Sequence, residues 1–150
     1  MSEKRSISQT SLETLFQRLQ EQGFRLIAPR SQREQIFFEE VRTPAEVTWD
    51  SLQTTLSPKE ILFPRYENLL KYKFQGKNVL LTNSEPLPKP TIIFGVHPCD
   101  AAALQILSQV FLTDYVDTHF KQRADSTTVV GMACTECDEH CFCTSVGGSP

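Results

Sequence analysis

Apolar residues recur along the chain with two different periods, and these periods predict a mixture of helices and strands. A helix is expected to begin at Ser11, and Gly23 stands where a left-handed cap would end it. Four apolar side chains follow helical spacing within it: Leu12, Leu15, Phe16 and Leu19. The polar residues 1–10 in front of this helix predict a disordered tail. After it, "GFRLIAP" and "QIFFEEV" predict two short strands that pair as a hairpin.

The middle of the chain predicts two helical segments separated by a proline. At Ser57 the sequence "SPKE" combines an N-cap serine, a proline at the first helical position and a glutamate at the third. Pro64 must end or kink that helix. The spacing of the apolar residues in "RYENLLKYKF" then predicts a second helix over 65–74, closed by Gly76. The short apolar stretch "NVLLT" that follows predicts a strand.

The second half of the chain predicts a β-α-β unit. "TIIFGV" is apolar without alternation, as expected for a strand that is covered on both faces, and "CDAAALQILSQVF" follows it as a helix. After a short polar helix in "DTHFKQRAD", "TTVVGMA" predicts another apolar strand parallel to the first. The fold class that follows is α/β, a mixed sheet with helices packed on it. We expect a single domain over 11–150 that ends in a cysteine-rich loop, 134–150.

Charge and composition narrow the possible partners. The net charge is −3, from 15 basic and 18 acidic residues, which gives no electrostatic footprint for nucleic acid. No apolar run approaches the roughly 20 residues that a membrane helix requires. The amino-terminal sequence "MSEKRSISQT" lacks the apolar core of a secretory signal, so the expected location is the cytoplasm. In that reducing compartment, disulfides are the weaker explanation for cysteines.

The five cysteines lie in two places that the predicted topology brings together. Cys99 follows the strand "TIIFGV", and four more cysteines stand in "CTECDEHCFC" after the strand "TTVVGMA". In open α/β sheets, ligands collect beyond the carboxyl ends of the strands. If the two strands are parallel neighbours, both groups of thiols emerge at the same edge of the sheet. We therefore expect Cys99 to lie close to the loop 134–143.

The spacing of the thiols favours an iron-sulfur cluster over zinc. A four-iron cluster takes four thiolates, and zinc can also take four in a tetrahedral site. The C-x-C spacing of Cys141 and Cys143 is tighter than in zinc knuckles, and Phe142 between them could shield a cluster from water. The alternative is a zinc-stabilised structural or interaction domain, in which His140 could be a ligand. A third and weaker interpretation is a thiol-disulfide device that uses Cys134 and Cys137.

Three stretches carry a resemblance to a known family: "KEILFPRYENLLKY", "IIFGVHPCDAAALQIL" and "VGMACTECDEHCFCTSVGGSP". With these, the chain resembles the iron-sulfur electron-transfer subunits that include the beta subunit of cytosolic sulfhydrogenases and the A subunit of anaerobic sulfite reductases. His97 departs from the arginine that is common in the family. Such subunits normally continue into a ferredoxin-like region with two further four-iron clusters. The resemblance therefore implies that this chain is the amino-terminal part of a longer subunit.

The resemblance also implies a ligand set and partners. The thiols that match the family are those of Cys99, Cys134, Cys141 and Cys143, which would hold one 4Fe-4S cluster. Cys137 is supernumerary and a possible substitute ligand. The chain would then perform no bond chemistry itself. The implied partners are a flavin-bearing electron-transfer subunit and a catalytic oxidoreductase subunit, with neither nucleic acid nor a membrane among them.

Overall fold

The computed structural model describes residues 6–83 and 88–149. The first helix, α1 (Gln9–Glu21), begins two residues before the predicted start, because the Ser8 hydroxyl accepts a hydrogen bond of 3.1 Å from the backbone N–H of Ser11. Residues 1–5 of the predicted tail lie outside the described residues, and its last two already belong to α1. The helix ends at Gly23, which has the left-handed φ of +86° that the sequence suggested.

A four-stranded mixed sheet forms the centre of the molecule. Its spatial order is β2 (Gln35–Glu40), β1 (Arg25–Gln32), β5 (Thr91–Val96) and β6 (Thr127–Gly131). β1 and β2 form the predicted antiparallel hairpin, whereas β1, β5 and β6 run parallel to one another. The helices α3 (Pro98–Leu112) and α4 (Thr118–Asp125) connect β5 to β6. The predicted fold class and the β-α-β unit are therefore confirmed.

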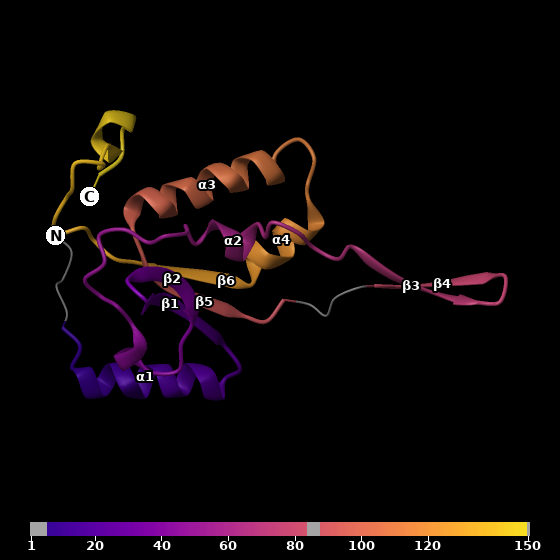
Figure 1. Ribbon diagram of the computed structural model, residues 1–150, viewed down its shortest axis with the longest axis horizontal. Coiled ribbons are helices and arrows are strands. Elements are labelled where there is room, and N and C mark those ends of the chain that lie inside the picture. Colours follow the sequence, from indigo (N-terminus) through magenta and orange to yellow (C-terminus); the bar gives the residue numbers. More distant parts are fainter. Residues whose placement is uncertain (1–5, 84–87, 150) are drawn as a thin grey trace.

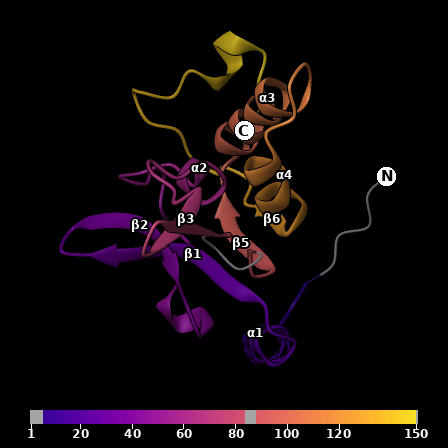
Figure 2. The ribbon, with the colours of Figure 1, turned by 90° about the vertical axis from the view of Figure 1, so that its right-hand side faces the viewer.

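Helices cover the sheet on both faces (Figure 2). On one face, α1 buries Phe16, whose ring stacks on Phe94 of β5 with centroids 4.9 Å apart. On the other face lie α2 (Lys59–Leu62), α3 and α4. There, Ile93 and Val96 pack with Ala101 of α3, and further residues form an adjoining cluster: Leu62, Leu104 and Phe120. Within the described residues, no helix combines the length and the apolar character that crossing a membrane requires.

The two parallel strands of the β-α-β unit differ in burial. Every residue of β5 is buried, as its unbroken apolar sequence predicts. β6 lies at the edge of the sheet, and its Val129 and Val130 are 37% and 39% exposed. The apolar run therefore indicated a strand correctly in both cases. Only β5, however, is covered on both faces.

The helix predicted over 65–74 is wrong. Residues 70–83 instead form an antiparallel hairpin of β3 (Leu70–Gln75) and β4 (Asn78–Asn83), which projects from the body of the molecule (Figure 1). Tyr72 and Phe74 alternate with lysines, so the stretch also fits a period of two, and Gly76 supplies the left-handed φ of +61° in the turn. Every residue of β3 is exposed. Because this segment does not pack against the core, burial did not favour a helix over a strand.

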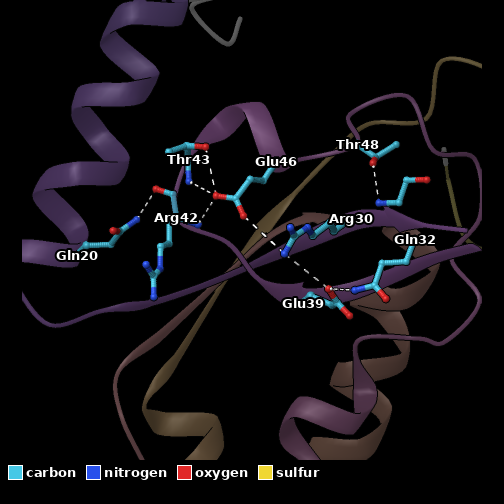
Figure 3. A network of polar contacts seen from close by, with 9 residues as sticks. Gln20, Arg30, Gln32, Glu39, Arg42, Thr43, Glu46 and Thr48 are labelled. Atoms are coloured by element: carbon cyan, nitrogen blue, oxygen red, sulfur yellow. Dashed lines mark hydrogen bonds and ion pairs between the residues drawn. The ribbon is translucent and has the colours of Figure 1, made fainter.

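A network of polar contacts holds the segment after β2 against β1 (Figure 3). One carboxylate oxygen of Glu46 accepts hydrogen bonds from the backbone N–H groups of Arg42 and Thr43, at 3.1 and 3.0 Å. The other oxygen lies 3.6 Å from Arg30 of β1. Together with the short helix η1 (Pro44–Glu46), these contacts fix the turn that leads towards residues 51–57. Backbone hydrogen bonds to Glu46, chiefly that from Arg42, lower the pKa of its carboxyl group.

Candidate metal centre

The sheet places the two cysteine-bearing segments at one edge. In the parallel pair of β5 and β6, Val96 is the partner of Gly131. The N–H of Met132 donates to the carbonyl of Val96 at 2.9 Å, which continues the pairing one residue further. Cys99 follows Val96 by three positions and Cys134 follows Gly131 by three positions. The expectation that both cysteines leave the sheet at the same edge is therefore confirmed.

A bulge at the end of β5 directs the chain towards Cys99. The register of β5 and β6 shifts between Phe94 and Val96, and Gly95 between them has a φ of +72°. A Cβ atom on Gly95 would lie 3.0 Å from the Cδ of Pro29 in β1. Only glycine therefore fits both the backbone conformation and the space beside Pro29.

Cys99 is the second residue of α3 and is exposed. The helix begins directly after the buried His97, whose carbonyl accepts a hydrogen bond of 2.9 Å from the N–H of Ala101. Asp100 follows in the first turn, where a carboxylate is favourable beside the positive end of the helix dipole. Buried β5 and the first turn of α3 therefore hold the Cys99 backbone in a well-defined place.

The other four cysteines lie on a loop that rises beside the amino-terminal end of α3 (Figure 1). Cys134 and Cys143 are half-buried, whereas Cys137 and Cys141 are exposed. Cys143 begins a single turn of 3-10 helix, η2 (Cys143–Val146), which ends at Gly147 in the left-handed conformation. The N–H of Gly148 then donates to the carbonyl of Cys143 at 2.8 Å. Two short turns, this one and the turn from Asp138 to Cys141, therefore shape the loop at Cys141 and Cys143.

Asp138 organises the tighter of the two turns. Its backbone N–H donates to the sulfur of Cys141 at 3.4 Å, and its carbonyl accepts from the N–H of Cys141 at 3.2 Å. Its carboxylate accepts hydrogen bonds from the N–H of His140 at 2.9 Å and from the side-chain amide of Gln53 at 2.6 Å. The pKa of the Asp138 carboxyl is lowered, first by its hydrogen bond with Cys141 and then by the N–H of His140.

Other cysteines affect the pKa values of Cys134 and Cys141. Burial raises the pKa of Cys134, and the nearby thiols of Cys99, Cys141 and Cys143 raise it further. Cys137 acts on Cys141 instead. There, the Asp138 N–H favours the thiolate, but the Asp138 carboxylate, desolvation and Cys137 outweigh it, so the pKa of Cys141 is raised. The three groups that affect Cys134 are the other three cysteines in the ligand set implied by the resemblance.

These thiols are neighbours without forming a closed ligand set. Among the residues that the structure describes, no three Cys, His, Asp or Glu side chains stand close enough together to hold a metal ion, and all five cysteines are free thiols. Four thiols at one sheet edge nevertheless match the soft donors that iron-sulfur clusters and zinc take. Phe142 is 68% exposed, so the expected shielding by this ring is not seen. His140 is exposed too, with its Nε2 3.6 Å from a carboxylate oxygen of Glu139.

Sequence reasoning missed two residues beside this centre, Gln53 and Ser57. Gln53 contacts the cysteine loop through Asp138, and the Ser57 hydroxyl lies 2.5 Å from the carboxylate of Asp100, next to Cys99. Ser57 was identified only as a helix cap. It does accept a hydrogen bond of 3.4 Å from the N–H of Lys59, but α2 is a single turn. Nothing in the local sequence indicates the second partner.

Comparison with known proteins identifies a relative. No protein-family model and no solved structure matches the chain. Sulfhydrogenase 2 subunit beta of Pyrococcus furiosus is 33% identical over 132 residues, which make up 88% of this chain and 37% of that subunit. The chain thus spans little more than a third of the length of this relative. The match confirms the resemblance found in the sequence, and over these residues the chain is similar to a sulfhydrogenase beta subunit.

Proposed function

We propose that this chain is an iron-sulfur electron-transfer module of a hydrogenase complex. One 4Fe-4S cluster would be held by Cys99, Cys134, Cys141 and Cys143. When bound, such a cluster supplies one-electron transfer. The chain's own residues hold the ligands at the sheet edge, while the half-buried side of the loop, at Cys134 and Cys143, limits the access of water.

The observation that carries this proposal is the set of thiols around Cys134. Cys99 and Cys134 each lie three residues after the paired ends of β5 and β6, and the thiols of Cys99, Cys141 and Cys143 each raise the pKa of Cys134. Separate chain segments that deliver thiols to one place are typical of a metal centre and are not needed for packing. The relationship to a sulfhydrogenase beta subunit supports iron-sulfur rather than zinc. Cys137 stands outside the ligand set that the resemblance implies, as a supernumerary thiol.

The partners and the compartment follow from the same proposal. A flavin-bearing electron-transfer subunit would exchange electrons with this module, and a catalytic oxidoreductase subunit would carry out the bond chemistry. The relative is a subunit named within a sulfhydrogenase, so a hydrogenase complex is favoured over a sulfite reductase. The resemblance to cytosolic sulfhydrogenases makes the cytoplasm the proposed compartment.

Anaerobic purification followed by metal and sulfide analysis tests the proposal. We expect a brown protein with a broad absorption at about 400 nm, and about four irons and four sulfides per chain. A colourless protein with one zinc per chain would instead support the zinc-stabilised domain. Protein that holds neither metal after reconstitution with ferrous iron and sulfide would contradict both interpretations.

A further inference from the structure

Both cysteine-bearing segments contact the same short stretch of chain, residues 53–57. At one end of this stretch, the amide of Gln53 donates to the Asp138 carboxylate at 2.6 Å. At the other end, the Ser57 hydroxyl is hydrogen-bonded to the Asp100 carboxylate at 2.5 Å. The partners are 85 and 43 positions apart in the sequence. Each acidic partner stands beside a cysteine, since Asp100 follows Cys99 and Asp138 follows Cys137.

The two contacts lie at points that control the placement of sulfur atoms. Asp138 forms both hydrogen bonds that shape the turn to Cys141, one of them directly to the sulfur. Asp100 lies in the first turn of α3, next to Cys99. A contact that fixes Asp138 therefore fixes the turn that carries Cys141, and a contact that fixes Asp100 braces the start of α3.

We infer that Gln53 and Ser57 are positioning residues that hold the two cysteine-bearing segments next to each other before any metal binds. The inference rests on the proposed function, because it gives these contacts a purpose in assembling the centre. The eleven residues from Met132 to Phe142 contain no helix or strand, so closing this loop onto Cys99 has an entropic cost. Two contacts to one stretch of the body lower that cost by restricting the loop in advance.

The inference can be tested without iron, by measuring how readily Cys99 and Cys141 meet. The background protein is metal-free and has Cys134, Cys137 and Cys143 replaced by Ser. Diamide is the oxidant, and it accepts the two electrons and two protons that Cys99 and Cys141 lose when they form a disulfide. Loss of one net hydrogen bond should slow this pairing about fivefold in Gln53→Ala. Ser57→Ala should slow it as well. Gln53→Lys should keep a rate close to the background, because an ammonium group can also donate to the Asp138 carboxylate.

Matched controls separate positioning from folding. Gln105→Ala removes an exposed amide from α3 and should leave the pairing rate unchanged, and the midpoint of thermal unfolding should be the same in all variants. If Gln53→Ala lowers the unfolding midpoint, Gln53→Glu serves in its place, since it keeps the shape and repels Asp138. Equal pairing rates in Gln53→Ala and Gln105→Ala, or no pairing in the background protein, would overturn the inference. Neither result bears on whether the wild-type protein binds iron.

Discussion

The two cysteine-bearing segments are built in opposite ways. Cys99 follows a strand in which every residue is buried, and it stands at the start of a helix of 15 residues. The loop from Cys134 to Cys143 is mostly exposed and is shaped by two short turns and by the contacts of Asp138. This difference teaches how such a centre can assemble. The sheet supports one proposed ligand, Cys99, and the other three proposed ligands lie on the loop.

The largest expected effect concerns which thiols hold the metal. Replacing Cys99, Cys134, Cys141 or Cys143 by Ser should remove most of the iron, because a four-iron cluster needs one ligand at each corner. Cys137→Ser is the matched control within the same loop and should keep nearly all of it. Iron and sulfide per chain after anaerobic reconstitution measure the difference. The opposite ranking would reject the ligand set, and it would make Cys137 a ligand.

Removing the metal should affect the two segments differently. Glu136 and Glu139 are exposed in the loop, so a protease that cleaves after glutamate can reach them. We expect metal loading to slow cleavage at these two sites about tenfold, the effect of about 1.4 kcal/mol of local stabilisation. Cleavage after exposed Glu21, on the far side of the sheet in α1, is the internal control and should not change. Equal cleavage with and without metal would show that the loop is already fixed by the protein alone.

A glycine in each segment tests the difference in rigidity. Gly95→Ala forces a left-handed φ on alanine and brings its Cβ within 3.0 Å of Pro29, so we expect a loss of about 1–3 kcal/mol in the free energy of unfolding. Gly147→Ala in the loop has a similar φ of +76° but no atom within 4 Å. Urea denaturation of the metal-free proteins should therefore show a larger shift for Gly95→Ala, which adds the contact with Pro29 to the backbone strain, than for Gly147→Ala. Similar shifts would mean that the loop is part of the cooperative fold.

The same contrast explains what the sequence could predict. β5 and α3 follow from apolar patterns because burial against a packed core enforces one period. The stretch that became β3 contains apolar residues that fit both a helix and a strand, and it lies outside that core. Tyr72 and Phe74, alternating with lysines before Gly76, were the signal for a strand. Local propensity decided the outcome where tertiary packing did not.

The centre was predictable only in part for a related reason. Because β5 and β6 are parallel neighbours, Cys99 and Cys134 lie at the same edge of the sheet, and this topology can be derived from the sequence. The contacts of Gln53 and Ser57 join residues that are 85 and 43 positions apart, through loops with no regular period. No pattern in the sequence connects such partners.

The smallest expected effect is a dependence of stability on pH that comes from Cys134. Its pKa is raised in the folded protein, first by burial and then by its three neighbouring thiols, so the folded chain keeps this proton to a higher pH than the unfolded chain. The folded state then binds more protons above about pH 9, and stability falls as pH rises through that range. Below it, the contribution is fully present.

Cys134→Ala should remove this part of the pH dependence from the metal-free protein. The measurement is the urea midpoint at about pH 7.5 and about pH 9.5, compared between wild type and variant, because the other thiols and the tyrosines titrate in both. We expect a smaller decrease in the variant. Cys137→Ala is the control, since Cys137 is exposed and does not act on Cys134. If both variants keep the wild-type decrease, the thiols are not close in the metal-free protein, and the loop would have to move further to reach Cys99.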